Sequence, residues 1–412
     1  MKSLLIFLLL ASSVSTYGLS LDQRLAKVIN AYSLEPVECD RGDSGDVLEP
    51  EASIGKLLFT SKFLSGGNDT SCSTCHIEAL SMTDGLSLSV GVSGHGEGLE
   101  RMDSKGVLVP RNAFTLFGRS KPGYTTFFWD GKVQEEDSVI FSSIGNGYLL
   151  GFDSPLAVAS IMPLLARDEF LGEHGIVFQS DDVAEVNTAY YQDQFWAANR
   201  VLQQKLSNNS EDVSELKRLL FASGRETLTL AEVGNFLARF IQSLDKPCLQ
   251  TGWQRYLTGD LGALTQNQKR GALLFYGKGR CAVCHSGKLM SDFQFHSIGV
   301  PQGGFGPYIH GQDIGRAAVT FNLKDRYKFR TPPLLLVSKT SPYGHNGVFK
   351  DLESVVLFHI NPISFLSDWS WSSDREFYKY GNVMSTRSEL LGFIDISDDD
   401  QFSDLMDFIR SL

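Results

Sequence analysis

Two short runs constrain this chain more than any other feature: Cys72-Ser-Thr-Cys75-His76 and Cys281-Ala-Val-Cys284-His285. Each is a complete C-x-x-C-H motif, the pattern of c-type haem attachment. Two thiols at this spacing form thioether bonds to the two vinyl groups of one porphyrin, and the imidazole that follows becomes the proximal ligand of the iron. The sequence therefore predicts two covalently bound c-type haems, one at each motif.

Other uses of paired cysteines fit the pattern less well. A zinc site would need its C-x-x-C pairs close together, whereas these pairs lie about two hundred residues apart and each carries its own histidine. A thioredoxin-like dithiol has no use for a histidine directly after the second cysteine in both copies. Haem attachment is the interpretation that gives a role to all four cysteines and both histidines of the two motifs.

The beginning of the chain resembles a secretory signal. Met1 and Lys2 precede an apolar run from Leu4 to Leu10 and then small residues. We predict a signal peptide over residues 1–18, with cleavage after Ser15 or Gly18. No later stretch is apolar for long enough to predict a membrane span in the mature chain, and the expected location is the periplasm.

The charge balance bears on partners. The formal net charge of −11 is acidic before any haem propionate is counted, which argues against nucleic acid and favours a basic electron donor. Cys39 and Cys248 are the two cysteines outside the motifs. In an oxidising compartment they can pair as a disulfide, and two unpaired buried thiols are the alternative.

A weak internal repeat surrounds the two motifs. Gly55-Lys-Leu-Leu-Phe59 precedes the first and Gly271-Ala-Leu-Leu-Phe275 the second, while Met82-Thr-Asp84 and Met290-Ser-Asp292 follow them. Duplication of a cytochrome c-like domain explains this pattern. Apolar residues recur at helical spacing over residues 154–170, 183–206, 210–223 and 229–244.

The expected fold class is mainly α, with two cytochrome c-like haem domains and long irregular loops. Glycine-rich stretches predict loops at residues 91–98, 118–123 and 299–311, and loops of this length usually cover or line a site. We place one domain at residues 21–244 and a second at 245–412, with the softest boundary near Lys246-Pro247-Cys248.

Several further motifs resemble one family, the bacterial di-haem cytochrome c peroxidases, which include the MauG-type enzymes. The resemblance covers nearly all of the mature chain. The motifs are Gly55–Phe59 with Leu64-Ser-Gly-Gly, Pro110-Arg-Asn-Ala113 with Thr115-Leu-Phe117, Phe128-Trp-Asp-Gly131, Tyr327-Lys-Phe-Arg-Thr-Pro-Pro-Leu334 and Ser341-Pro-Tyr-Gly-His-Asn-Gly347. The chain departs from the family at Leu335-Leu336, where relatives usually show Arg-Asn.

The resemblance implies different roles for the two haems. The N-terminal haem, with His76 as proximal ligand, would react with peroxide, and the C-terminal haem, with His285, would relay electrons. In the family, the helix after the P-Y-x-H-x-G motif supplies the second axial ligand of the relay iron. Here the matching residue is His359, with His345 as the rival candidate and a surface histidine as the plain alternative.

The resemblance also implies an acid–base residue beside the peroxidatic iron. In the family a Gln, a Pro and a Glu follow the tryptophan motif at fixed spacing. Pro163 and Glu169 match the last two, and Glu169 is the expected catalytic residue. The alternatives are that Glu169 is an exposed glutamate on a helix, or that its neighbour Asp168 points inward instead. The Gln position holds Ala159, which removes one hydrogen-bonding partner of the peroxide.

Three more residues acquire roles by the same resemblance. Trp129, in the F-W-D-G motif, would lie between the haems and relay electrons, with core packing as its alternative. His95 lies in a region that in some relatives supplies a blocking ligand to the resting peroxidatic iron. Asn112 and Thr331 would bind a calcium ion between the domains, since a hard cation suits such oxygen ligands, although Asn112 could equally be a turn residue.

The expected function is reduction of hydrogen peroxide to water, with electrons from a small cytochrome c or cupredoxin. One alternative is a MauG-like oxidase that uses peroxide to modify a partner protein, which a His ligand at the relay haem disfavours. Another is a di-haem electron carrier without peroxide chemistry, which Ala159 favours. Relatives are often dimers, so a homodimer is a further expectation.

Overall fold

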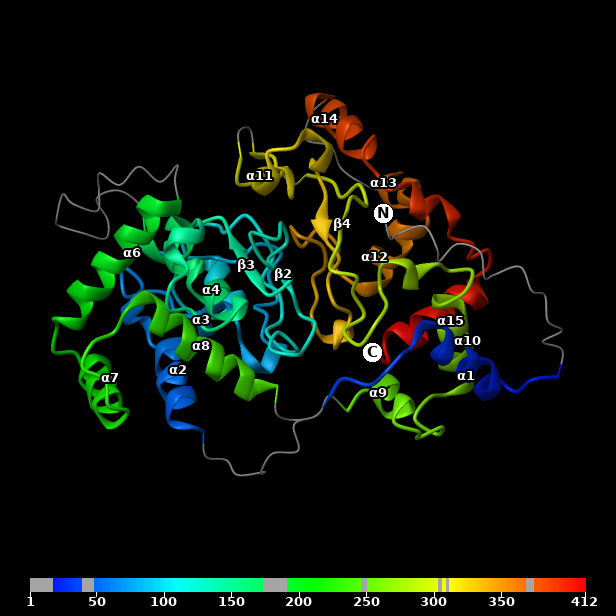
Figure 1. Ribbon diagram of the computed structural model, residues 1–412. Coiled ribbons are helices and arrows are strands. Elements are labelled where there is room, and N and C mark those ends of the chain that lie inside the picture. Colours follow the sequence, from blue (N-terminus) through cyan, green and yellow to red (C-terminus); the bar gives the residue numbers. More distant parts are fainter. Residues whose placement is uncertain are drawn as a thin grey trace.

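The computed structural model describes residues 18–38, 48–172, 191–245, 250–302, 306–308, 311–367 and 374–412. Helices dominate the described residues, which confirms the mainly α class. Figure 1 shows two groups of elements side by side, one built from the first half of the chain and the other mostly from the second half. Long irregular segments run between the helices of both groups.

The first group consists of helices around a small sheet. Its helices are α2 (Pro50–Thr60), α3 (Cys72–Cys75), α4 (Pro155–Ile161), α6 (Tyr191–Leu206), α7 (Glu211–Ala222) and α8 (Leu230–Leu244). Its three strands form an antiparallel sheet in the order β1 (Thr126–Phe127), β2 (Val133–Glu136) and β3 (Val139–Ser142). Helix α4 packs against both β2 and α8, so the sheet lies at the edge of the helical core.

The second group has more short helices and one strand pair. Its helices are α9 (Gly252–Leu257), α10 (Gln266–Phe275), α11 (Ala317–Thr320), α12 (Leu352–Ile360), α13 (Pro362–Ser367), α14 (Asp374–Met384) and α15 (Asp399–Ile409). Strands β4 (Phe295–His296) and β5 (Phe329–Arg330) pair antiparallel. Helices α10 and α15 pack against each other in this group.

The internal repeat is visible as the same helix crossing in both groups. Gly55 of α2 lies against α8 so closely that a Cβ there would be 1.9 Å from the Phe236 carbonyl oxygen. Gly271 of α10 lies against α15 in the same way, 1.9 Å from the Asp404 carbonyl oxygen. Only glycine allows backbones to approach like this. Each of the two sequence repeats therefore specifies the same close helix crossing at a glycine, once in each group.

The first helix, α1 (Leu21–Tyr32), packs against the second group although the sequence assigns it to the first domain. Asp22 makes an ion pair of 2.6 Å with the buried Lys269 of α10. The Tyr32 hydroxyl donates a hydrogen bond to the Tyr276 carbonyl oxygen. In Figure 1, α1 accordingly lies beside α10 and α15. The domain division at residues 244 and 245 stays a prediction, but α1 belongs in space to the second group.

The continuous helix expected over residues 154–170 is wrong. Ser154 caps α4 by accepting a hydrogen bond from the Ala157 amide, and the helix ends at Ile161. Pro163 then begins a short 3₁₀ turn, because a proline lacks the amide that an α-helix needs at this point. A π-helical turn follows at Arg167–Leu171. This break separates Glu169 from α4 and gives it a different orientation.

The other expected helices agree better with the structure. Ser210 caps α7, and Thr229 caps α8 through a reciprocal pair of hydrogen bonds with Glu232, so both helices begin where the polar residues predict. The helix expected over residues 183–206 is described only from Tyr191.

Some predictions fall outside the described residues. They include residues 1–17 of the predicted signal peptide, the expected domain boundary at 246–248, and both Cys39 and Cys248. Within the described ranges, no helix combines the length and the apolarity that crossing a membrane requires.

Candidate haem sites

The first C-x-x-C-H motif lines a mostly apolar cavity in the first group. Cys72 and Cys75 occupy the single turn of α3, and His76 follows directly. The Nδ1 atom of His76 lies 2.9 Å from the Met82 carbonyl oxygen, which can only accept, so Nδ1 carries the proton and Nε2 remains as the ligand atom. Burial lowers the pKa of His76 to about 4 and keeps the ring neutral, as an iron ligand must be.

Two of the predicted peroxide-site residues line this same cavity. Pro163 and Glu169 lie there together with Ala159 and Ser160. The π-helical turn brings Glu169 into the cavity wall, and such turns occur frequently at functional sites. Burial, and then the negative charge of the adjacent Asp168, raise the pKa of Glu169 to about 7.

Asp168 does not line the cavity. Its carbonyl oxygen accepts a hydrogen bond from the Val92 amide, which ties the π-helical turn to the neighbouring loop. Gly91 of that loop approaches the same oxygen closely, since a Cβ at position 91 would be 1.8 Å from it. Of the two adjacent acids, Glu169 is thus the one that lines the cavity, and its role as the acid–base group stays a prediction.

The second motif lines a larger cavity in the second group, and His359 lines it too. His285 Nδ1 lies 3.2 Å from the Met290 carbonyl oxygen, and His359 Nδ1 lies 2.7 Å from the Val355 carbonyl oxygen. Both rings therefore keep Nε2 for a metal. Burial, and then the charge of His359, lower the pKa of His285 to about 4, which keeps the His285 ring neutral.

The two cavities differ in the axial ligands that they offer. Among the described residues that line the first cavity, His76 is the only histidine, and methionine, lysine and tyrosine are absent from its wall. The second cavity contains His285 and His359, each with a free Nε2. Haem iron in the first cavity would thus find one histidine ligand among these residues, whereas in the second both His285 and His359 would be available to it.

The remaining histidine candidates fit ligation less well. His345 lines the second cavity, but its ring stacks on Phe329 with 3.7 Å between centroids. Burial lowers its pKa to about 4. His95 is exposed on its loop and does not line the first cavity. In this conformation His95 is not positioned as a blocking ligand.

The F-W-D-G segment lies between the cavities. Trp129 is 8% exposed, lines the second cavity, and donates a hydrogen bond of 3.1 Å from Nε1 to the Asn112 carbonyl oxygen. Its neighbour Phe128 lines the first cavity. Gly131 closes the turn with a φ of +69°, and a Cβ there would be 2.3 Å from the Phe295 ring. The segment therefore places one aromatic ring against each cavity.

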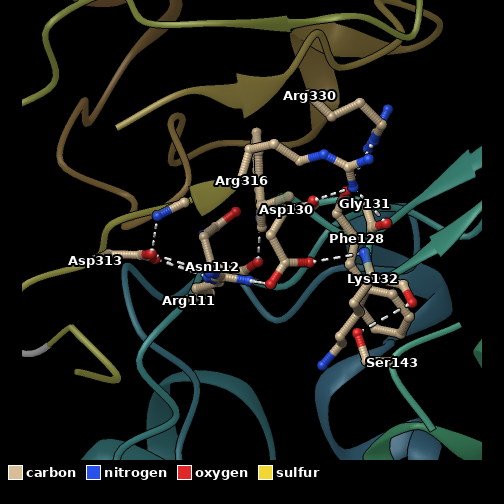
Figure 2. Close-up of polar contacts among 12 residues, drawn as sticks. Arg111, Asn112, Phe128, Asp130, Gly131, Lys132, Ser143, Asp313, Arg316 and Arg330 are labelled. Atoms are coloured by element: carbon tan, nitrogen blue, oxygen red, sulfur yellow. Dashed lines mark hydrogen bonds and ion pairs between the residues drawn. The ribbon is translucent and has the colours of Figure 1, made fainter. Parts of the chain in front are cut away.

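A buried ion-pair network holds this segment in place (Figure 2). Arg111 bonds Asp313 through Nε at 2.7 Å and Nη2 at 2.9 Å, and bonds Asp130 through Nη1 at 2.5 Å. Asp130 in turn accepts from the Lys132 amide, and Arg316 donates to the carbonyl oxygens of Asp130 and Gly131. Asp313 and Arg316 come from the second group, so charged side chains join the two groups beside Trp129.

The two predicted calcium ligands also line the second cavity. The Asn112 side-chain nitrogen donates a hydrogen bond of 2.7 Å to the Leu86 carbonyl oxygen, which leaves its oxygen as the atom that can ligate a cation. The Thr331 carbonyl oxygen already accepts from the Ser291 hydroxyl at 2.7 Å. A calcium site at Asn112 and Thr331 stays a prediction.

Sequence reasoning missed one group of residues around these cavities. Arg119 lines both cavities, and Arg330 and Tyr124 line the second. Arg330 belongs to the Tyr327–Leu334 motif, but the family resemblance predicted no role for its charge. Arg119 lies in a glycine-rich stretch, which predicted only a loop. Nothing in the local pattern reveals that this loop passes between two cavities.

Two buried cavities, each lined by a C-x-x-C-H motif with a neutral imidazole, are the arrangement of a protein that holds two haems. Comparison with known families agrees with that class. The chain belongs to the di-haem cytochrome c peroxidase family, whose family model matches residues 49–262. This confirms the family and the enzyme class that the motifs predicted.

Curated relatives carry the names of both branches of the family. The cytochrome-c peroxidase IdrP2 of Denitromonas iodatirespirans is 28% identical over 328 residues, which cover 74% of this chain and 72% of the relative. The methylamine utilization protein MauG of Methylorubrum extorquens is 26% identical, covering 76% and 69%. The cytochrome c551 peroxidase of Nitrosomonas europaea is 25% identical, covering 78% and 75%.

Solved structures share the fold over nearly the whole chain. A MauG-like protein associated with microbial copper homeostasis aligns with a TM-score of 0.58 and 20% identity, covering 92% of this chain and 93% of that one. The diheme peroxidase BthA from Burkholderia thailandensis aligns with a TM-score of 0.57 and 19% identity, covering 92% and 90%. At this identity the likeness establishes the fold.

Proposed function

We propose that this protein is a periplasmic di-haem peroxidase, which reduces hydrogen peroxide to water with electrons from a small cytochrome c or cupredoxin. Membership of the di-haem cytochrome c peroxidase family supports the reaction class. The formal charge of −11 supports a basic donor protein. Each turnover consumes one hydrogen peroxide, two electrons and two protons, and releases two water molecules.

The observation that carries this proposal is the difference between the two cavities. Among the described residues, the first offers one histidine and a carboxyl group, whereas the second offers several histidines, of which His285 and His359 bond a backbone carbonyl through Nδ1 and keep Nε2 for iron. An enzyme needs an iron that a small molecule can reach, whereas a pure electron carrier has no use for an open position or for an ionisable group beside it. We therefore assign peroxide reduction to the first cavity and electron entry to the second.

The residues of both cavities fit haem as a cofactor. In the first cavity Cys72 and Cys75 would form the thioether bonds and His76 would ligate iron, while apolar side chains surround the ring. In the second cavity Cys281 and Cys284 would attach the porphyrin, with His285 and His359 as axial ligands. Haem in these places supplies the redox-active iron from which peroxide takes its electrons.

Glu169 is the proposed acid–base residue. Its carboxylate would accept the proton of one peroxide oxygen and deliver it to the other, so that the second oxygen leaves as water. A pKa of about 7 suits both halves of this transfer, because the group exchanges its proton readily near neutral pH. Pro163 shapes the wall beside Glu169, and Trp129 is the proposed electron relay between the cavities.

Spectra and a turnover assay test the proposal. We expect the ferric protein to show one high-spin and one low-spin haem, to bind one cyanide per two haems, and to oxidise a reduced cytochrome c with peroxide at a stoichiometry of two electrons per peroxide. Two low-spin haems that exclude cyanide would instead establish an electron carrier. Peroxide consumption without donor oxidation, accompanied by oxidised residues on a partner, would establish a MauG-like oxidase.

A further inference from the structure

The wall between the two cavities contains a buried cation with no counter-ion. Arg119 is 4% exposed and lines both cavities. Its Nε donates a hydrogen bond of 2.8 Å to the Thr115 carbonyl oxygen. Its Nη1 is buried and has no hydrogen-bond partner among the described residues. Arg119 makes no ion pair within the described part of the chain.

Two aromatic rings fix the Arg119 guanidinium. The Phe114 ring centroid lies 3.9 Å from Cζ and the Tyr124 centroid 4.9 Å from it. Phe114, like Arg119, lines both cavities. Rings on the guanidinium faces leave only its edge for hydrogen bonds. Nη1 on that edge is the donor still without a partner.

A second cation and a hydroxyl lie in the same region. Arg330 is 1% exposed and lines the second cavity, where it donates to the Phe128 carbonyl oxygen, as Figure 2 shows, and to the Thr331 carbonyl oxygen. It too makes no ion pair with a described residue. The Tyr124 hydroxyl is buried without a partner. Burial, with the positive charge of Arg330 acting in the same direction, lowers the pKa of Arg119 to about 10. Guanidinium groups stay protonated in proteins, so both arginines are charged at neutral pH.

The Asp245 carboxylate acts on Arg119 electrostatically but makes no ion pair with it. The Asp245 carboxylate accepts from the Gly118 and Ser120 amides and from the Ser120 hydroxyl, so its oxygens are already engaged. Two buried guanidinium groups without an anion are strongly unfavourable. Whatever fills the cavities must therefore bring negative charge to this wall. The donor geometry of arginine matches a carboxylate best.

Haem supplies that charge. Each c-type haem carries two propionates on the edge of the porphyrin opposite its thioether bonds, so the protein must meet carboxylates across each cavity from its cysteines. We propose that Arg119 binds a haem propionate and that both haem cavities share it, with Arg330 and the Tyr124 hydroxyl completing the carboxylate site. This inference rests on the proposed haem occupancy, but not on peroxide turnover.

Sharing has a measurable consequence. A positive charge beside both porphyrins favours the reduced form of each iron, so its removal lowers both reduction potentials. At an effective dielectric constant of about 20 and a separation of about 10 Å, one charge changes each reduction equilibrium on the order of tenfold. For a one-electron couple, tenfold corresponds to about 59 mV.

The test uses the full-length holoprotein and its variants Arg119→Gln and Arg119→Lys. Spectroelectrochemistry gives both haem potentials, and resonance Raman gives the propionate bending bands. We expect Arg119→Gln to lower both potentials and shift the propionate bands, and Arg119→Lys to keep the potentials near wild type while still shifting the bands. Arg218→Gln is the matched control, since it removes one charge from an exposed arginine that pairs with Glu215.

Each outcome decides the inference. Unchanged potentials and bands in Arg119→Gln would overturn it, and a shift confined to one haem would refute the sharing. If Arg119→Gln does not fold, Tyr124→Phe replaces it, with a shifted propionate band expected and an unshifted band counting against the site. Wild-type protein without haem, or with haem but without peroxide turnover, would instead refute the proposed function.

Discussion

Removal of the Glu169 carboxylate is the sharpest test of the proposed chemistry. Glu169→Gln keeps the size of the side chain but cannot accept a proton. Because general acid–base catalysis typically contributes about 10²- to 10⁴-fold, we expect kcat/KM for peroxide to fall by at least about a hundredfold. Haem content should not change, since Glu169 is neither an attachment residue nor an axial ligand in the proposed site.

The pH dependence of the wild type provides the second half of this test. Burial, and then the charge of Asp168, raise the pKa of Glu169 to about 7. The base must be ionised to take a proton from peroxide, so kcat/KM should decline below pH 7 and reach about one hundredth of its plateau two units lower. Glu169→Gln should lose this acidic limb together with its activity.

Asp168→Asn is the matched control. It removes an acid from the same π-helical turn, but one that does not line the cavity. Activity at the plateau should therefore persist, while loss of the neighbouring negative charge lowers the pKa of Glu169 and moves the acidic limb to lower pH. The assay is steady-state oxidation of a reduced cytochrome c at constant ionic strength. Wild-type turnover in Glu169→Gln, or an acidic limb that Asp168→Asn leaves in place, would refute the reasoning.

Three further outcomes follow from the structure. His359→Gly should convert the second haem to high-spin, as absorption and EPR spectra would show, and an unchanged low-spin spectrum would identify another ligand. Gly271→Ala should destabilise the protein by about 1–3 kcal/mol or more in denaturant unfolding, because the new Cβ meets a backbone carbonyl. The control Gly381→Ala, which has open space around its Cβ position, should be neutral or stabilising. Equal effects of the two substitutions would contradict the close helix crossing at Gly271. Asp313→Asn should cost about 1–3 kcal/mol of unfolding free energy, because the buried Arg111 loses one charged partner and keeps Asp130. No measurable loss would mean that the Asp313 charge is not needed for stability.

Predictions from the sequence succeeded where chemistry imposes a fixed local pattern. The C-x-x-C-H motifs specify their own turn and histidine, and both line cavities as a haem site requires. Thr229 indicates the start of α8, because a capping side chain hydrogen-bonds to the backbone of the turn that follows it. The family motif indicated His359, which lines the second cavity, while its role as an iron ligand stays a prediction.

The sequence was less informative where distant segments meet. Apolar spacing alone suggested one helix through Pro163, although the proline breaks the hydrogen-bond ladder there. The position of α1 depends on contacts with α10 that no local pattern contains. The role of Arg119 depends on a wall that exists only when both groups are folded. Local propensity describes neither of these tertiary relationships.

The contact between α1 and the second group has a consequence for assembly. Tyr32 and the Tyr276 carbonyl that it binds are 244 residues apart in sequence. Closing so large a loop carries an entropy penalty, so this contact should form late, after each half has collapsed around its own core. Until then Lys269 remains without Asp22, and the C-terminal half is incomplete. A fragment that starts beyond α1 would therefore lack a part that only the opposite terminus can supply.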